Sequence, residues 1–201
     1  MDRNPFLQAF DLITTGGGDL WPIVFLSLRV TLTALMAAAI IGLPVGAWLG
    51  VSRFRGRNAL AVLFNAMMGL PPVVAGLALY LLLSRSGPFG FLGWLFTPAA
   101  MVAAQALLAL PIIISLTRQT VEDLWRDYEE GLTSLGSSRL RAIPTLLWDG
   151  RYSLLTGLLA GFGRASAEVG AVLIVGGNIA TITRTMTTAI ALETSKGDLA
   201  L

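Results

Sequence analysis

Long apolar runs alternate with polar segments along this 201-residue chain. Four runs, at about residues 21–50, 59–84, 98–116 and 152–175, match or approach the roughly 20 residues that a helix needs to cross a bilayer. The pattern predicts an all-α integral membrane protein in which these runs form a bundle of spans.

The polar segment 118–151 separates the third and fourth runs and carries nearly half of the charges in the chain. Loops rich in arginine beside membrane spans lie on the cytoplasmic side. Arg53, Arg55 and Arg57 follow the first run directly and place the first loop on the same side. Both loops are therefore predicted to be cytoplasmic, and four spans would leave both ends of the chain outside.

The segment 118–151 has a helical pattern of its own. It predicts a charged amphipathic helix over about residues 121–135 and a second short helix over 138–148 that contains Pro144. Gly136 lies between them and fits a helix C-cap. A cytoplasmic loop with this much structure is expected to dock on a partner protein.

Composition narrows the class of protein. The chain is 55% hydrophobic and 13% charged, whereas a soluble domain has about 25% charged residues. The arginines follow span ends instead of one basic face, which argues against nucleic acid binding despite the net charge of +2. The absence of cysteine and histidine excludes disulfides and removes the commonest metal ligand and general base. The acidic, glycine-containing residues 1–19 predict an outer lead-in without a signal peptide.

Glycines recur at four-residue intervals in two of the runs. Gly42, Gly46 and Gly50 share one face of the first span, and Gly157 and Gly161 share one face of the fourth. Small residues at this spacing allow another helix to approach closely. Both spans are therefore predicted to pack against neighbours along these faces.

The second run is interrupted by Gly69-Leu70-Pro71-Pro72. Consecutive prolines remove backbone donors, so the helix must bend or unwind there. Unwound backbone at membrane depth is tolerated against protein or a water-filled cavity. Pro71 and Pro72 therefore either lie beside a pathway or form a plain packing kink.

Arg164 and Glu168 are four residues apart near the middle of the fourth run. On one continuous helix they would share a face and could pair. Charges at this depth usually face the bundle interior or a water-filled path. The pair is thus either a pathway-lining gate or a salt bridge that holds helices together.

The last 26 residues are rich in threonine. Gly176-Gly177-Asn178 is predicted to break the fourth span, and residues 185–192 have a helical pattern. A new apolar run starts at about Asp198.

The cytoplasmic loop resembles the signature of ATP-binding-cassette (ABC) importer permeases. That signature has a glutamate, two small residues and a glycine six positions after the glutamate. Glu130, Gly131, Leu132 and Gly136 match it, with Gly131 and Leu132 in place of the usual alanines. The usual closing Leu-Pro is replaced by residues 147–151, LWDGR. The resemblance implies a type I importer fold and a coupling helix that inserts into the ATPase subunit. It assigns this coupling to Glu129, Glu130, Gly131, Leu132, Gly136, Arg139 and Pro144.

Three further stretches resemble oxyanion permeases of the molybdate and tungstate type. Residues 69–76 and 163–179 are similar to the group as a whole, and residues 183–199 look most like the tungstate branch. The resemblance covers residues 20–201, which we define as the permease domain, with residues 118–151 as its coupling loop. Such permeases continue into one more span, so the chain is expected to be truncated before its last span.

The resemblance also implies the partners. A homodimer of this subunit would work with two cytoplasmic ABC ATPases and an external oxyanion-binding protein in the bacterial inner (plasma) membrane. ATP and Mg²⁺ would bind the ATPase, so no cofactor and no catalytic residue is expected in this chain. A tetrahedral dianion needs hydrogen-bond donors along its path. The candidate pathway or gate residues are Pro71, Pro72, Arg164, Glu168, Asn178, Arg184, Thr187 and Thr188.

Three alternatives remain open at this stage. The cargo could be molybdate or sulfate instead of tungstate. The chain could be a channel or an ion-coupled carrier without an ATPase, although inverted repeats typical of carriers are not evident. A membrane hydrolase is the third alternative, but Lys196 is the only lysine and Glu168 the only acid deep in a span.

Overall fold

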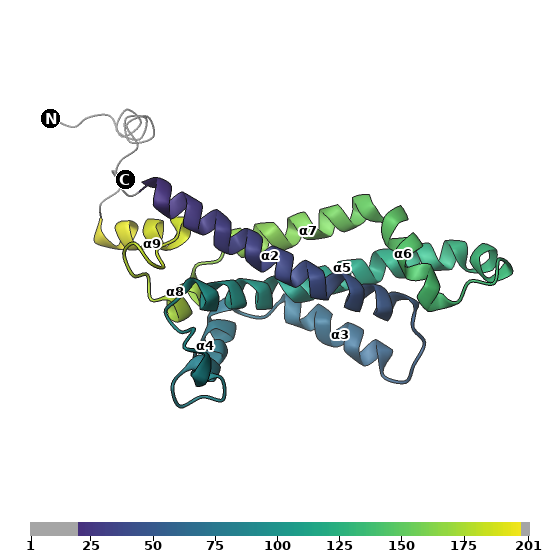
Figure 1. Cartoon of the computed structure of the whole chain (residues 1–201), viewed down its shortest axis with the longest axis horizontal. Helices are drawn as coiled ribbons and strands as arrows, with labels where there is room; N and C mark the ends of the chain where they lie inside the picture. Colours follow the sequence, from purple (N-terminus) through teal and green to yellow (C-terminus); the bar gives the residue numbers. More distant parts are fainter. Residues whose placement is uncertain (1–19, 198–201) are drawn as a thin grey trace. The chain divides into compact units, whose positions relative to one another are not determined.

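The computed structural model describes residues 20–197, so the predicted lead-in 1–19 and the run that begins at Asp198 lie outside it. The regular elements of the described residues are all helical, which confirms the all-α prediction. In chain order they are α2 (Leu20–Val51), α3 (Arg57–Met68), α4 (Pro72–Leu83), the short 3-10 helix η1 (Gly90–Leu92), α5 (Pro98–Ser134), α6 (Arg139–Asp149), α7 (Arg151–Ser166), α8 (Gly170–Gly176) and α9 (Met186–Lys196) (Figure 1).

Two of these helices, α2 and α5, are long and apolar enough to cross a membrane. The pairs α3 with α4 and α7 with α8 pass the same test when each broken pair is taken as one span, which gives up to four spans among the described residues. The break between α3 and α4 falls at residues 69–71, as the glycine and prolines predict. The chain is thus a membrane protein.

The described residues form two compact units. One, the outer unit, comprises residues 20–33, 72–105 and 166–197; the other, the coupling unit, comprises residues 34–71 and 106–165. We name them after the predicted positions of their loops. The coupling unit contains all of residues 118–151.

In the coupling unit, the glycine face of α2 packs against α5. A Cβ atom on Gly42 would lie 2.8 Å from Ile113 Cγ2, and one on Gly46 would lie 2.7 Å from the carbonyl oxygen of Ile114. Small residues face the neighbour and large residues face outward: Ala38 is 1% exposed, whereas Ile40 is 71% exposed. Lipid tails can cover such large side chains, so close backbone packing rather than hydrophobic burial holds these helices together.

Helix α7 approaches α5 in the same way. A Cβ atom on Gly157 would lie 3.3 Å from Leu116 Cβ, and one on Gly161 would lie 3.3 Å from Ile113 Cγ1. Ile113 therefore lies between the glycine faces of α2 and α7. Both predicted glycine faces are confirmed as close helix contacts.

A separate apolar cluster packs the polar end of the coupling unit. It joins the end of α2, the extension of α5 and one face of α6, and its buried members are Ala47, Val51, Val121, Trp125, Ala142 and Leu146. The amphipathic helices of the loop thus have a core of their own.

In the outer unit, α4 packs against α8. A Cβ atom on Gly76 would lie 2.6 Å from Ala171 Cα, which leaves no room for any side chain. The C-terminal Gly176 of α8 lies against Met101 of α5, where a Cβ atom would be 3.0 Å from Met101 Cγ. The outer unit therefore also depends on small residues at helix crossings.

Two predicted boundaries are wrong. The apolar run 98–116 and the helix predicted over 121–135 are not separate helices, because α5 continues from Pro98 without a break to Ser134. No glycine or proline interrupts residues 112–130, and Arg118 pairs with Glu122 one turn later, so the helix continues out of its apolar section. The short second helix, predicted over 138–148, is confirmed as α6.

The fourth span is also not one continuous helix, because α7 ends at Ser166 and α8 begins at Gly170. Arg164 and Glu168 therefore do not share a face of one helix, as the spacing of four residues had suggested. The Glu168 carboxylate accepts the N–H of Ala171 at 2.9 Å, in the first turn of α8. A side chain that satisfies the amide of a new helix stabilises the break before it.

Candidate functional site

The C-terminus of α5 forms the predicted glycine cap. Gly136 has a φ of +75°, its N–H donates to Thr133 O at 2.9 Å, and the N–H of Ser137 donates to Leu132 O at 2.9 Å. This pair of hydrogen bonds is a Schellman motif with glycine in the left-handed position. The motif turns the chain sharply from α5 into α6 and confirms Gly136 as the cap.

Two glutamates on the α5 extension, Glu122 and Glu129, bind arginines from residues 53–57. Glu129 bridges Arg53 at 3.4 Å and Arg139 at 2.7 Å. Arg139 also lies over the ring of Trp125, 5.6 Å from its centroid. Glu129 and Arg139, both predicted to couple to the ATPase, therefore already bind within this chain, and we infer that they shape the docking surface.

Arg57 makes the most extensive contacts of this network. Its Nε donates to Leu49 O at 2.8 Å, its Nη2 lies 3.4 Å from Gly50 O, and the same Nη2 lies 2.8 Å from Glu122 Oε2. One guanidinium thus satisfies carbonyls at the end of α2 and a carboxylate on α5. Carbonyls at a helix C-terminus have no partner within the helix, so a cation there is favourable.

We expect Arg57→Ala to lower the stability of the coupling unit by about 1–3 kcal/mol, because hydrogen bonds to charged groups contribute on that order. Thermal unfolding of the detergent-solubilised protein measures the change. Arg55→Ala is the matched control, since the exposed Arg55 lies in the same loop. Equal melting temperatures for both variants would show that the contacts of Arg57 contribute nothing.

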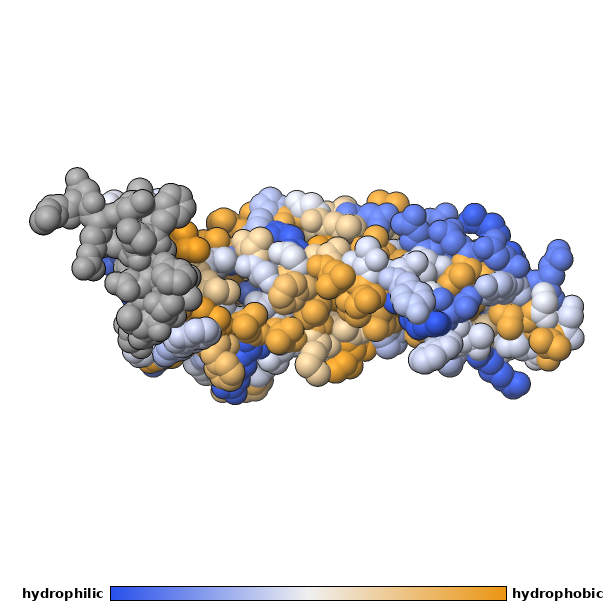
Figure 2. Space-filling model, turned by 90° about the horizontal axis from the view of Figure 1, so that it is seen from above, coloured by the Kyte–Doolittle hydropathy of each residue, from blue (hydrophilic) through white to orange (hydrophobic). Residues whose placement is uncertain are grey.

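Beyond this network, the turn between α5 and α6 exposes apolar side chains. Leu135 is 85% exposed and Leu140 is 59% exposed, and Glu130, Gly131 and Gly136 beside them are also exposed. Figure 2 shows hydrophilic residues gathered around the α5–α6 end, with hydrophobic ones among them. We call Glu130, Gly131, Leu135, Gly136 and Leu140 the coupling tip.

The sequence analysis missed Leu135 and Leu140. The available signal was two leucines within a strongly polar loop, one directly before the capping glycine. By contrast, Leu132 is half-buried against the apolar cluster, and Pro144 is an exposed residue inside α6. Exposed apolar side chains within a strongly polar segment are typical of a contact surface.

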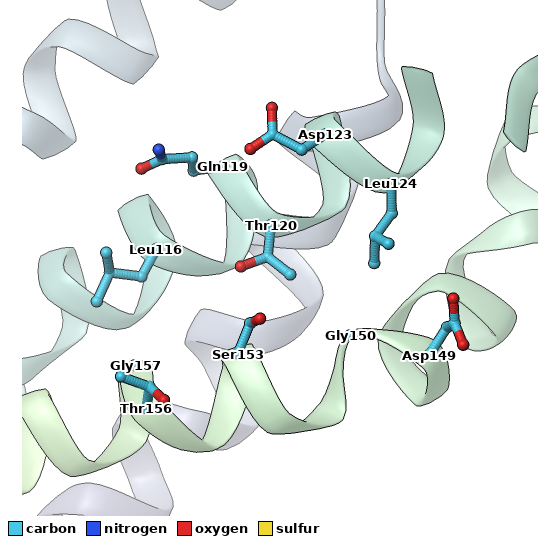
Figure 3. A pocket seen from close by; sticks show the side chains of 10 residues that line it. All are labelled: Leu116, Gln119, Thr120, Asp123, Leu124, Asp149, Gly150, Ser153, Thr156 and Gly157. Carbon is cyan, nitrogen blue, oxygen red and sulfur yellow. The ribbon is translucent and has the colours of Figure 1, made fainter. Parts of the chain in front are cut away.

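An open cleft of about 380 Å³ lies between α5 and the α6–α7 junction of the coupling unit (Figure 3). Thr120 from α5 and Ser153 from α7 point toward it, and Asp123 and Asp149 lie at its polar end. Asp149 accepts a hydrogen bond from Tyr128 Oη at 2.7 Å. Two carboxylates repel an anion, so this cleft does not fit an anionic substrate.

In the outer unit, Glu168 is 2% exposed and connects two helix starts. Its carboxylate caps the first turn of α8, and its backbone carbonyl accepts a hydrogen bond from Thr187 Oγ1 at 3.0 Å. These contacts join α8 to α9 and favour a structural contribution from Glu168.

We expect Glu168→Ala to reduce the stability of the outer unit by about 0.5–2 kcal/mol, the usual cost of losing a side-chain acceptor at a helix start. Glu168→Gln keeps an acceptor for the Ala171 amide and should retain more of that stability. Melting temperatures of the purified variants measure both effects. An alanine variant as stable as the wild type would contradict the capping contact.

Most threonines of the C-terminal stretch have structural partners. Thr185 and Thr188 form a capping box at the start of α9, in which the N–H of Thr185 donates to Thr188 Oγ1 at 2.9 Å. Thr183 Oγ1 donates to Gly176 O at 2.6 Å and closes the end of α8. Thr188 is fully buried and its hydroxyl donates to Thr185 O at 3.2 Å, and its role in transport stays a prediction.

The remaining pathway candidates are distributed over both units. The outer unit contains Pro72, Asn178, Arg184 and Thr187, whereas Pro71 and Arg164 belong to the coupling unit. Asn178 has a left-handed φ of 48° after the break at Gly177, and its Nδ2 lies 3.5 Å from Thr188 O. Arg184 and Thr187 are both half-buried. Their roles in transport stay predictions.

The family model described as "Binding-protein-dependent transport system inner membrane component" matches residues 42–195, and the chain belongs to this family. It is therefore a permease subunit of an ABC importer, a translocation component and not itself an enzyme, with the type I permease fold.

The most informative relatives are anion permeases. A "Probable anion ABC transporter permease protein" of Haloferax volcanii is 40% identical over 182 residues, which cover 88% of this chain and 78% of the relative. "Tungstate uptake system permease protein TupB" of Peptoclostridium acidaminophilum is 37% identical over 193 residues, with coverages of 96% and 85%. "Putative molybdenum transport system permease protein YvgM" of Bacillus subtilis is 32% identical over 186 residues, with coverages of 87% and 81%. The predicted resemblance to oxyanion permeases is confirmed.

Proposed function

We propose that this chain carries a tetrahedral oxyanion, tungstate, across the plasma membrane in an ATP-driven importer. The similarity to a tungstate permease over nearly the whole chain carries the proposal. The tail at residues 183–199, which looks like the tungstate branch, supports the same cargo. In bacteria this is the inner membrane.

The importer would contain two copies of this permease, two cytoplasmic ATPases and an external oxyanion-binding protein. The coupling tip is the surface that we assign to the ATPase, because its exposed leucines lie outside the predicted spans. ATP binding would close the ATPase pair, and the tip would transmit that motion to the spans. Weak contacts in the permease suit passage of the ion, so selectivity would reside mainly in the binding protein.

Uptake into proteoliposomes tests this proposal. The permease is reconstituted with its ATPase and binding protein, and entry of tungstate is measured with and without ATP, then with excess molybdate or sulfate. We expect ATP-dependent uptake that a tenfold excess of sulfate does not inhibit. Uptake without ATP or without the ATPase would indicate a channel or carrier instead.

Molybdate is the second candidate cargo. The relative named as a molybdenum transport permease shares 32% identity with this chain, so the class of protein does not separate the two ions. Tungstate and molybdate have the same charge and the same tetrahedral geometry. Competition measured separately on the binding protein and on the full complex would assign the preference.

A further inference from the structure

The outer unit contains a small cavity of about 30 Å³ that is lined by both polar and apolar side chains. Its walls come from α2, from the apolar half of α5, from the end of α7 and from the start of α9. None of the described residues that line it is charged. They are Ser27, Leu28, Thr31, Gln105, Ser166, Thr185, Met186 and Thr187.

Gln105 is the most informative of these residues. It lies within the apolar half of α5 and is 3% exposed, yet its Oε1 atom has no hydrogen-bond partner among the described residues. Burying an unpaired carbonyl is costly, and polar groups at membrane depth are rare without a function. A leucine at this position would fill the same space without the free-energy cost of burying an amide, so packing does not explain the amide.

The cavity is lined by groups that can both donate and accept hydrogen bonds. Hydroxyls do so by rotation, and rotation about the last bond of Gln105 presents either its carbonyl or its amino group. A volume of about 30 Å³ has room for a water molecule. It is too small for a five-atom oxyanion, so the cavity would have to widen to admit one.

We propose that Gln105, with the hydroxyls of Thr31 and Ser166, forms a transit site that contacts the transported oxyanion when the cavity opens. The proposal rests on the function proposed above. In the closed form, the Gln105 carbonyl accepts a hydrogen bond from water. In the open form, the amino group and the hydroxyls donate to the anion. A lining without fixed positive charge solvates the ion and releases it again.

Gln105→Glu tests the site, because it keeps size and shape while adding a negative charge where an anion passes. We expect uptake at pH 8 to fall at least tenfold in the reconstituted importer, while ATP hydrolysis by the complex persists. Lowering the pH to 5.5 protonates more of the introduced carboxyl, so uptake should recover severalfold relative to the wild type. Gln105→Leu should reduce uptake about threefold to tenfold at both pH values.

Ser115→Ala is the matched control, since Ser115 is a buried polar residue on the same helix that does not line this cavity. It should transport like the wild type. If Gln105→Glu does not assemble, Thr31→Val tests the transit site instead. It removes one lining hydroxyl at nearly constant volume and should lower uptake severalfold. Wild-type uptake in Thr31→Val and Gln105→Leu, or in an assembled Gln105→Glu, would overturn the transit site. A wild-type complex that transports no oxyanion would instead overturn the proposed function.

Discussion

Replacing Leu135 with aspartate is expected to abolish ATP-driven uptake while the permease still folds. Leu135 is 85% exposed at the coupling tip, so the folded chain loses almost no packing when it is changed. In the assembled importer we expect the same side chain to be buried against the ATPase. Burying a leucine contributes about 1.5–3 kcal/mol, and a buried unpaired carboxylate costs further free energy.

We expect Leu135→Asp to weaken binding of the ATPase strongly and to change the folding stability of the permease little. Each 1.4 kcal/mol corresponds to a factor of ten, so affinity for the ATPase should fall by a factor on the order of 30 or more. Pull-down of the ATPase by detergent-solubilised permease measures it, together with uptake in proteoliposomes. Leu135→Met is the matched control and should bind like the wild type. If Leu135→Asp bound the ATPase as well as the wild type does, the assignment of the coupling tip to the ATPase interface would be wrong.

Gly131→Trp adds bulk to the coupling tip without adding charge, so it separates the effect of size from the effect of charge at this surface. A Cβ atom on Gly131 would meet no atom within 4 Å, and its backbone is helical, so a side chain can be added there without backbone strain. Gly136 differs, because its left-handed φ would strain any larger residue. Gly131→Trp is therefore a cleaner probe of docking than Gly136→Trp, whose effect would mix backbone strain with steric conflict.

Local signals in the sequence predicted much of the fold. The spacing of Gly42, Gly46 and Gly50 identified the helix crossing correctly, because a missing Cβ reports directly on close backbone approach. Gly136 was equally informative, since only glycine adopts a left-handed cap at low cost. At each of these positions the glycine itself indicates the local geometry, either a close helix contact or a left-handed backbone.

Predictions from the sequence were less accurate where contacts between separate helices determine the structure. A spacing of four residues suggested that Arg164 and Glu168 share a helix, but the Glu168 carboxylate takes the Ala171 amide and a new helix starts there. Thr187 and Thr188 were predicted to donate hydrogen bonds to a passing anion. Burial of Thr183 and Thr188 and their hydrogen bonds to helix ends became apparent only once α8 and α9 were placed together.

The candidate site shows the same limit. Glu130 and Gly131 could be assigned from the loop signature, and both are exposed at the tip. Leu135 and Gln105 could not, because their significance lies in exposure and burial that contradict their chemistry. The sequence shows a leucine in a polar loop and an amide in an apolar run, but only the structure shows that Leu135 is exposed and that Gln105 is buried.

Replacing Gly76 with valine is expected to prevent the outer unit from folding. A Cβ atom at this position would lie 2.6 Å from Ala171 Cα and 3.3 Å from Ala171 O, both backbone atoms that cannot rotate away. Inserting atoms into a well-packed contact usually costs about 1–3 kcal/mol, and a backbone collision lies at or above the top of that range. Helices α4 and α8 would have to separate, and the outer unit would lose their mutual packing.

Size-exclusion chromatography and thermal unfolding in detergent measure this effect. We expect Gly76→Val to give little monodisperse protein, whereas Gly163→Ala should behave like the wild type, since a Cβ atom on that helical glycine meets nothing within 4 Å. Adding Ala171→Gly should not rescue Gly76→Val, because the nearest conflict is with the Cα atom that glycine retains. Recovery of normal stability in that double variant would mean that the two helices pack through side chains, and the close backbone crossing of α4 and α8 would then be wrong.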